Sequence, residues 1–192
     1  MEDEELWNML KQGHRDALEK IFRQYVRILY AYGNRFTQDT ALVEDCIQDL
    51  FQEIWHKRDT LGATDSIKRY LLGALRYGII RKLRQGASFS SLQDTPSREF
   101  QLTLSVEEVL MAEEQTQLER TALQNAILKL TPRQREAVYL RYFQQLSYDE
   151  VAKVMHISYQ AARNLTYQSL KHLKQYLSAI RALCIVGSTL FF

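Results

Sequence analysis

Two stretches of the chain are rich in cationic side chains and contain no acidic residue. The first runs from Ile67 to Arg84 and holds Lys68, Arg69, Arg76, Arg81, Lys82 and Arg84. The second follows Glu150 and holds Lys153, Arg163, Lys171, Lys174 and Arg181. Lysine and arginine neutralise phosphates, so two basic stretches in a chain of net charge +2 indicate a protein that grips a polyanion at two places. The plainer alternative is that each stretch is an ordinary solvated helix face.

Residue patterns for catalysis or metal binding are missing from the sequence. Cys46 and Cys184 are too far apart for zinc-ligand spacing or a disulfide framework, which favours a reducing cytosol. No Gly-rich phosphate loop or nucleophile elbow occurs, and the histidines have no carboxylate or cysteine partner pattern: they are His14, His56, His156 and His172. We therefore expect no enzymatic activity, no small-molecule substrate, no metal and no cofactor.

Neither end of the chain predicts export or membrane insertion. The start, MEDEELWNML, is acidic and amphipathic, whereas a secretory signal needs a basic start and an apolar run. The apolar tail at residues 183–192 is shorter than the roughly 20 residues that span a bilayer. We expect a cytoplasmic protein whose tail packs against its own core.

Helical periodicity dominates the sequence and predicts an all-α fold. Apolar residues recur at three- and four-residue spacing over 17–36, 41–57 and 67–84. Residues 86–104 are rich in serine, include a proline and show no sustained period, which predicts a flexible linker. The expected architecture is therefore two small helical domains, 1–85 and 105–182.

The second domain carries start signals for a helix-turn-helix, after a predicted helix over 105–130. Thr131 begins a capping box with Pro132 at the first helical position, and Ser147 repeats the device three residues before Glu150. A short break at 156–157 precedes a long helix predicted to extend to about residue 177. Two helices joined by such a break form a helix-turn-helix, whose second helix can enter the major groove of DNA.

The side chains expected to point outward at the start of that second helix suit DNA. They are Ser158, Tyr159, Gln160, Arg163, Asn164, Tyr167 and Lys171. Arginine pairs well with guanine, glutamine and asparagine pair with adenine, and a helix N-terminus attracts phosphate. Ala152, Ile157 and Ala162 are the expected internal contacts that set the angle between the helices. Two packed helices of a bundle without a nucleic-acid role are the alternative.

Three segments are informative when taken together: LTPRQREAVYLRYFQQLSYDEVAKVMHIS (130–158), ALVEDCIQDLFQEIWHKRD (41–59) and SIKRYLLGALRYGIIRKLRQ (66–85). They resemble the bacterial RNA polymerase sigma factors, in particular the extracytoplasmic-function (ECF) group of the sigma-70 family. The first segment resembles the promoter-recognition domain of that family, the second its polymerase-binding helix and the third its promoter-opening helix. The segments occur in the family's order and spacing, within 17–85 and 105–177.

The resemblance implies a transcription initiation factor that binds core RNA polymerase and directs it to specific promoters. In the family, the polymerase-binding helix docks on a coiled coil of the largest subunit, and here the matching exposed acceptors are Asp45, Gln48, Asp49, Gln52 and Glu53. The loop at 59–66 would receive a base flipped from the minus-ten element. The following helix would track the opened single strand with Lys68, Arg69, Tyr70, Arg76, Tyr77, Arg81, Lys82 and Arg84. The helix-turn-helix would recognise the minus-thirty-five duplex. Family members are often held by an anti-sigma factor, and no residue here identifies one.

Two other functions remain open at this point. A stand-alone helix-turn-helix regulator would bind duplex DNA unaided and would not need the acidic residues of 45–53 or the basic helix at 67–84. A helical adaptor would leave both basic stretches unexplained. The sigma-factor interpretation requires the cations to lie on shared surfaces rather than buried against carboxylates. The sequence also departs from the family at His156, where glycine is common, and at Leu165 and Thr166 in the recognition helix.

Overall fold

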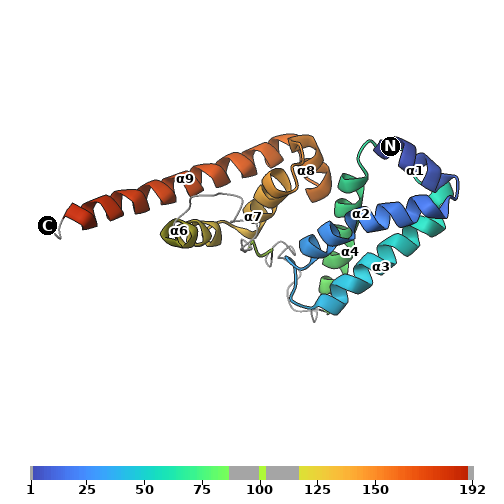
Figure 1. Ribbon diagram of the computed structural model, residues 1–192, viewed down its shortest axis with the longest axis horizontal. Coiled ribbons are helices and arrows are strands. Elements are labelled where there is room, and N and C mark those ends of the chain that lie inside the picture. Colours follow the sequence, from blue (N-terminus) through green and yellow to red (C-terminus); the bar gives the residue numbers. More distant parts are fainter. Residues whose placement is uncertain (1, 87–99, 103–116, 190–192) are drawn as a thin grey trace.

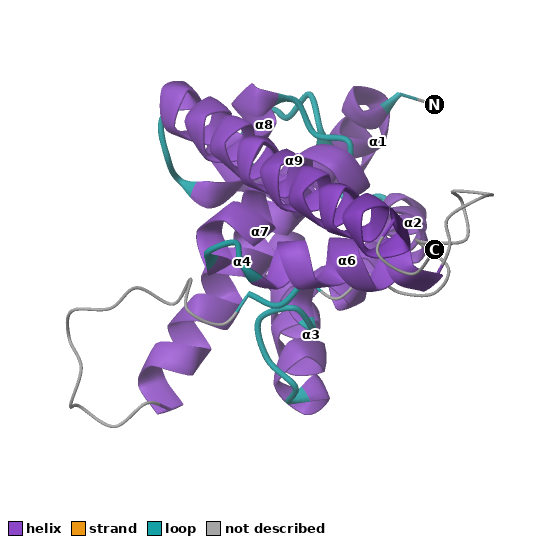
Figure 2. Cartoon of the chain, turned by 90° about the vertical axis from the view of Figure 1, so that its left-hand side faces the viewer, coloured by secondary structure: helices purple, strands orange, loops and turns teal. Residues whose placement is uncertain are grey.

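A computed structural model describes residues 2–86, 100–102 and 117–189, with side chains excluded at 86, 117–120 and 177–189. The described residues form helices, turns and loops, and none of them forms a strand (Figure 2). The helices fall into two groups that lie side by side (Figure 1). The all-α, two-unit prediction is confirmed.

The first unit is a four-helix assembly. Its elements are α1 (Asp3–Lys11), α2 (Arg15–Gly33), α3 (Thr40–Lys57), the short 3-10 turn η1 (Arg58–Thr60) and α4 (Ile67–Gly86). The apolar stripes found in the sequence form the core, where Ile21, Leu29 and Leu71 are each almost fully buried. A side chain at Gly33 would meet Val43 at 2.5 Å, so glycine allows α2 and α3 to pack closely.

The second unit contains the helix-turn-helix. Its elements are α6 (Gln117–Leu128), α7 (Pro132–Val138), the π-helical turn η3 (Tyr139–Phe143), α8 (Tyr148–Met155) and α9 (Tyr159–Thr189). Both predicted capping boxes form, one between Thr131 and Gln134 and one between Ser147 and Glu150. The first part of the helix predicted over 105–130 lies outside the described residues. The backbone of α9 continues to Thr189, well into the segment expected to be a separate tail.

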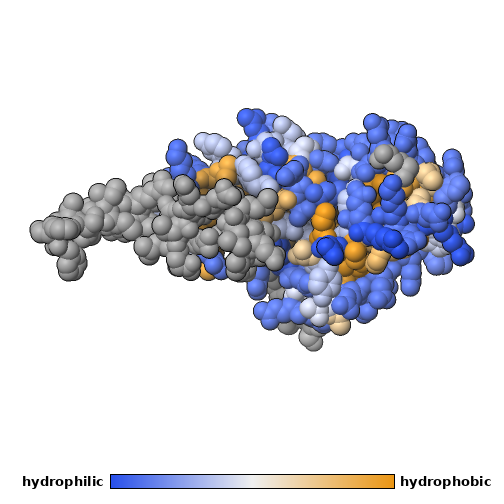
Figure 3. All heavy atoms as spheres, viewed as in Figure 1, coloured by the Kyte–Doolittle hydropathy of each residue, from blue (hydrophilic) through white to orange (hydrophobic). Residues whose placement is uncertain are grey.

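Aromatic residues join the two units. Phe100 and Leu102, from the segment predicted as a linker, are buried. The ring of Phe100 lies 5.1 Å from that of Phe36 and 5.8 Å from that of Tyr139. The linker prediction missed this contact because two apolar residues are hidden among polar ones. On the face shown in Figure 3 the surface is mostly hydrophilic, with apolar side chains visible where the units meet.

Within the described ranges, no helix has the length and apolar character that a bilayer span requires. Those residues also contain no group of three or more His, Cys, Asp or Glu side chains placed to hold a metal ion.

Candidate nucleic-acid interface

The start of α9 presents an exposed polar face. All seven residues predicted to meet the minus-thirty-five duplex are exposed: Ser158, Tyr159, Gln160, Arg163, Asn164, Tyr167 and Lys171. The Ser158 hydroxyl accepts a hydrogen bond from the backbone N–H of Ala161 at 3.1 Å and so begins the helix. Thr166 is fully buried and its hydroxyl donates to the carbonyl of Ala162 at 2.9 Å. The departure from the family pattern at Thr166 therefore lies on the inner face of the helix, away from its exposed side.

The turn between α8 and α9 contains one residue with a left-handed backbone conformation. His156 adopts a left-handed backbone with φ 52° and ψ 51°. The backbone N–H of Ile157 then bonds to the carbonyl of Ala152 at 3.0 Å, which closes the end of α8. Ala152 and Ala162 are buried and Ile157 is half-buried, so the expected contacts between the two helices form.

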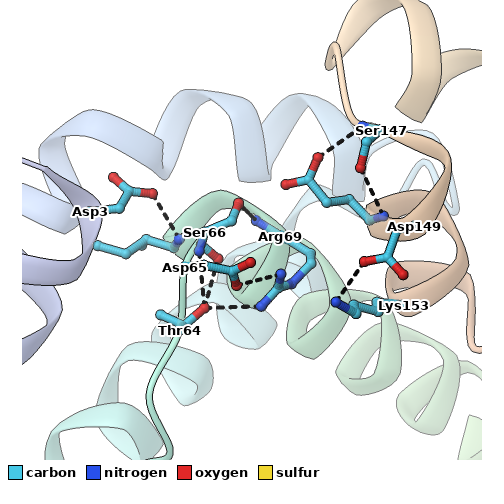
Figure 4. A network of polar contacts seen from close by, with 10 residues as sticks. Asp3, Thr64, Asp65, Ser66, Arg69, Ser147, Asp149 and Lys153 are labelled. Atoms are coloured by element: carbon cyan, nitrogen blue, oxygen red, sulfur yellow. Dashed lines mark hydrogen bonds and ion pairs between the residues drawn. The ribbon is translucent and has the colours of Figure 1, made fainter.

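The loop at 59–66 is held together at the start of α4 by its own side chains (Figure 4). The buried Thr64 hydroxyl donates to the carbonyl of Ser66 at 3.1 Å, and Ser66 caps the helix by accepting from the backbone N–H of Arg69 at 3.2 Å. The Arg69 guanidinium pairs with Asp65 at 2.6 Å and donates to Thr64 at 3.2 Å. The hydrogen-bonded ion pair with Arg69 lowers the pKa of Asp65. Arg69 is thus engaged in shaping the loop.

The N-terminal helix also supports this loop, a role that the sequence analysis did not foresee. The Asp3 carboxylate accepts from the backbone N–H of Ile67 at 2.9 Å, at the first residue of α4. The Trp7 indole donates to the carbonyl of Gly62 at 2.9 Å, and its ring lies 4.9 Å from that of Tyr70. Helix α1 therefore holds the loop at its middle and at its junction with α4.

The second half of α4 carries the remaining candidates for the single strand. Tyr77, Arg81 and Arg84 are exposed, with Tyr77 at 61%. Lys82 forms an ion pair with Asp49 of α3 at 2.7 Å, and this pairing raises the pKa of Lys82. The neighbouring face of α3 exposes all five predicted polymerase-binding acceptors: Asp45, Gln48, Asp49, Gln52 and Glu53. An acidic face thus adjoins a basic one along α3 and α4.

Arg76 does not lie on that surface. It is only 7% exposed, and its guanidinium grips the fully buried Glu136 of α7 through Nε to Oε1 at 2.7 Å and Nη2 to Oε2 at 3.3 Å. The Tyr32 hydroxyl donates to the same Oε1 at 2.7 Å. Burial alone would lower the pKa of Arg76, but the adjacent carboxylate raises it. Burial and that carboxylate also raise the pKa of Tyr32.

Lys68 is likewise turned toward the second unit. Its ammonium group donates to the backbone carbonyl of Gln144 at 2.6 Å, and burial lowers its pKa. The sequence analysis predicted that the basic residues of α4 share one exposed surface. Lys68 and Arg76 do not lie on such a surface, because both contact the second unit. The prediction holds at Arg81 and Arg84, which are exposed.

Sequence reasoning missed Glu136, although a signal for it was present. Arg76 occupies an inward position of α4 between the buried Leu72 and Ile80, and Glu136 lies one turn before the buried Leu140. Charged residues of opposite sign at two apolar positions predict a buried pair. Counting charges along the chain does not reveal such a pair, because the count ignores helical register.

Comparison with known protein families agrees with this geometry. The family model for sigma-70 region 2 matches residues 21–89, and the model for sigma-70 region 4 matches residues 120–173. The chain belongs to the ECF group of the sigma-70 family. It is a promoter-directing sigma factor, a class of transcription initiation factors and not of enzymes.

Two named relatives match most of the length of this sigma factor. It is 23% identical over 172 residues to RNA polymerase sigma factor YlaC of Bacillus subtilis, across 88% of this chain and 96% of YlaC. It is 28% identical over 182 residues to ECF RNA polymerase sigma factor BldN of Streptomyces coelicolor, across 90% of this chain and 65% of BldN.

Solved structures show the same fold. CnrH, determined in complex with the cytosolic domain of CnrY, superposes with a TM-score of 0.60 at 20% identity, across 92% of this chain and 97% of that chain. RpoE of Bartonella quintana, determined with the anti-sigma factor NepR, superposes with a TM-score of 0.56 at 17% identity, across 83% and 96%.

Proposed function

We propose that this sigma factor docks on core RNA polymerase through α3, recognises the minus-thirty-five duplex with α9, and holds the opened minus-ten strand on the 59–66 loop and α4. The observation that carries the proposal is the region 2 match over 21–89, which contains both α3 and α4. A stand-alone helix-turn-helix regulator needs neither element.

Recognition of the upstream duplex is assigned to the exposed residues at the start of α9. Arg163 offers the bidentate donor that suits guanine, while Gln160 and Asn164 offer the donor and acceptor pair that suits adenine. Ser158 lies at the helix N-terminus, where backbone N–H groups attract a phosphate. Tyr159, Tyr167 and Lys171 complete this surface.

Strand opening is assigned to binding rather than to catalysis. Extruding a base costs a few kcal/mol, and the opened state is favoured only if the protein binds single strand better than duplex. The loop offers the exposed Thr60 hydroxyl to a base edge, while Arg81 and Arg84 offer cations to phosphates and the exposed Tyr77 offers a stacking surface. Tyr70 and Lys82 lie at the edges of this surface, and Arg69 orders the loop from behind.

The acidic face of α3 is assigned to the polymerase, because five exposed acceptors disfavour contact with DNA. Asp49→Arg should weaken binding to core polymerase at least tenfold by reversing the charge at the centre of the face. Because Asp49 also pairs with Lys82 at 2.7 Å, Lys82→Ala is the matched control. It removes the same exposed pair, worth about 0–1 kcal/mol, but keeps the carboxylate. Pull-down with core polymerase measures both, and unchanged binding of Asp49→Arg would refute this docking face.

We also propose that an anti-sigma factor binds this chain. One structural neighbour, RpoE, was determined in complex with the anti-sigma factor NepR, and another, CnrH, in complex with the cytosolic domain of CnrY. Co-purification of the tagged chain from its own cells, followed by mass spectrometry, tests this part of the proposal.

Transcription from a promoter library tests the function as a whole. Core polymerase mixed with the purified chain should give transcripts with defined start sites, and core polymerase alone should not. A stand-alone regulator would instead retard duplex DNA without supporting any transcript. A helical adaptor would do neither.

A further inference from the structure

Two side chains of α1 contact the 59–66 loop, each across more than fifty residues of sequence. The Trp7 indole donates to the Gly62 carbonyl at 2.9 Å, in the middle of the loop. The Asp3 carboxylate accepts from the backbone N–H of Ile67 at 2.9 Å, where the loop enters α4 (Figure 4). Trp7 is only 1% exposed, so it lies behind the surface that the proposed function assigns to DNA.

The middle of the loop depends on such a contact, because its own structure is irregular. Residues 61–64 lie in no helix, strand or turn. The Thr64 hydroxyl orders the last part of the loop through hydrogen bonds to the backbone. Gly62 and Ala63 have no side-chain group that forms a hydrogen bond. The bond from Trp7 therefore supplies a constraint that the middle of the loop does not supply for itself.

The same part of the loop has room for a base edge. Gly62 and Ala63 are exposed, and a Cβ atom at Gly62 would meet nothing within 4 Å beyond its chain neighbours. The backbone there is open to a ligand while its carbonyl is held by the protein interior. A loop that must be ordered on binding loses part of its affinity, so fixing it beforehand strengthens capture of a base.

Helix α1 also sets the relation between the loop and α4. The ring of Trp7 lies 4.9 Å from the ring of Tyr70, which is half-buried at the edge of the proposed strand surface. The Asp3 carboxylate lies at the N-terminus of α4, where the positive end of the helix favours an anionic group. One short helix thus holds the loop, the start of α4 and an aromatic ring in a single arrangement.

We propose that Trp7 and Asp3 are positioning residues for base capture, because they hold the loop in the conformation that accepts the extruded base. This inference rests on the proposed function, which assigns that base to the 59–66 loop. It adds α1 to the elements that determine minus-ten recognition. A change at either residue should therefore weaken binding at one base of the strand and leave polymerase and duplex binding intact.

Trp7→Phe tests the contact in the middle of the loop. It keeps an aromatic ring in the core but removes the N–H that holds Gly62. Because Gly62 is exposed, water satisfies its carbonyl, and the loop gains freedom without leaving a buried group unpaired. Leu10→Val is the matched control, since it trims a fully buried side chain of the same helix and leaves both loop contacts in place.

Asp3→Ala tests the contact at the start of α4. Asp3→Asn is its conservative partner, because the amide oxygen accepts the same bond from Ile67. The Asp3 carboxylate also accepts from the Tyr25 hydroxyl at 3.3 Å, so Tyr25→Phe controls for loss of that contact. Rescue by Asp3→Asn would identify the hydrogen bond to α4 as the cause of any defect in Asp3→Ala.

The measurement uses the full chain in complex with core polymerase. Fluorescence anisotropy gives the affinity for a labelled single strand with the minus-ten sequence of a promoter that the wild type transcribes. One abasic site is moved along this strand. We expect the wild type to lose about tenfold in affinity when the abasic site replaces the captured base. In Trp7→Phe and Asp3→Ala that loss should shrink to about threefold or less, because the residue and the base are coupled.

The remaining measurements separate positioning from general stability. The effect of abasic sites elsewhere, binding to core polymerase and binding to the minus-thirty-five duplex should stay unchanged in Trp7→Phe and Asp3→Ala. The three controls should keep the full loss at the captured base: Leu10→Val, Tyr25→Phe and Asp3→Asn. A full loss retained by Trp7→Phe or by Asp3→Ala overturns the assignment of that residue.

An equal reduction in Leu10→Val would place the effect in core stability and overturn the proposal as a whole. Failure of the proposed function is distinguishable from both results. In that case no position of the abasic site would weaken binding by the wild-type chain itself.

Discussion

Arg163 extends from the exposed side of α9 in the first two turns of that helix, where a major groove can admit side chains. Replacing it with alanine should weaken binding to the preferred minus-thirty-five sequence by about 1–3 kcal/mol and relax the preference at one base pair. His172→Ala is the control, because His172 is exposed and points about half a turn around the helix from Arg163. Competition binding of the polymerase complex to duplexes varied at each position measures both. An unaltered base preference in Arg163→Ala would identify the residue as a bystander.

For single residues, the sequence predicted which side chains are exposed where exposure follows the helical period. It missed the side chains whose burial depends on a partner residue in another helix. The exposed set at the start of α9 follows from three- and four-residue spacing alone. Arg76 looks the same as Arg81 in a list of charges, yet one is 7% exposed and the other lies in solvent. Helical register distinguishes them, because Arg76 lies in line with the buried Leu72 and Ile80. The fold alone shows that its partner is Glu136 of another helix.

Among the elements, the turn between α8 and α9 has its backbone constraint at His156. An L-residue in the left-handed region is strained and glycine is not, while glycine loses more chain entropy on folding. The left-handed strain costs about 1–2 kcal/mol and the entropy of glycine offsets about 0.5–1 kcal/mol of that, so His156→Gly should raise the free energy of unfolding by about 0.5–1 kcal/mol. His156→Ala, which keeps the strain but removes the imidazole, should leave it nearly unchanged. Urea unfolding followed by circular dichroism measures all three proteins, and equal gains in both variants would place the effect in the side chain.

Helix α1 offers a second test through Tyr25, whose hydroxyl donates to Asp3 at 3.3 Å. Burial, with the Asp3 carboxylate beside it, raises the pKa of Tyr25 from 10.0 to about 12. The folded state therefore holds this proton more tightly than the unfolded chain does. The resulting stability is fully present below about pH 10 and is lost as the pH rises through the folded pKa near 12.

Tyr25→Phe cannot titrate, so it should flatten the fall in stability between pH 10 and 12 relative to the wild type. Other buried tyrosines contribute their own pH dependence to the stability of both proteins. The informative quantity is therefore the difference in stability between Tyr25→Phe and the wild type. Tyr77→Phe, at an exposed position of α4, controls for tyrosine loss in general. Urea midpoints across that range supply the data, and parallel curves for Tyr25→Phe and the wild type would contradict the assignment.

The helical elements were the most predictable part of the fold, and the segment between the units was the least. Capping boxes at Thr131 and Ser147 are local chemistry, so both helix starts were located from the sequence. Phe100 and Leu102 are buried only because Phe36 and Tyr139 come from different helices to meet them. The contacts of α1 with the 59–66 loop span more than fifty residues of sequence and were likewise out of reach.

For the whole molecule, the buried pair of Arg76 and Glu136 raises the question of whether it stabilises the contact between the two units or only specifies its geometry. A buried ion pair gains little over apolar side chains of similar size, whereas loss of one partner leaves an uncompensated charge that costs about 3–5 kcal/mol. The Arg76 and Glu136 side chains are 9% and 0% exposed, so water would screen little of the charge that loss of either partner leaves behind. The single changes and the double change should therefore have opposite consequences.

Arg76→Met and Glu136→Met made separately should each expand the chain, since each leaves the other charge without its partner. Glu136→Met also removes the acceptor of the Tyr32 hydroxyl. The double variant removes both charges and restores an apolar contact, so its radius of gyration should return close to that of the wild type. Such non-additivity is the signature of a direct pairwise interaction. Small-angle scattering gives the radius of gyration of each protein. Additive expansion by the two methionines would show that shape, and not charge pairing, determines how the units meet.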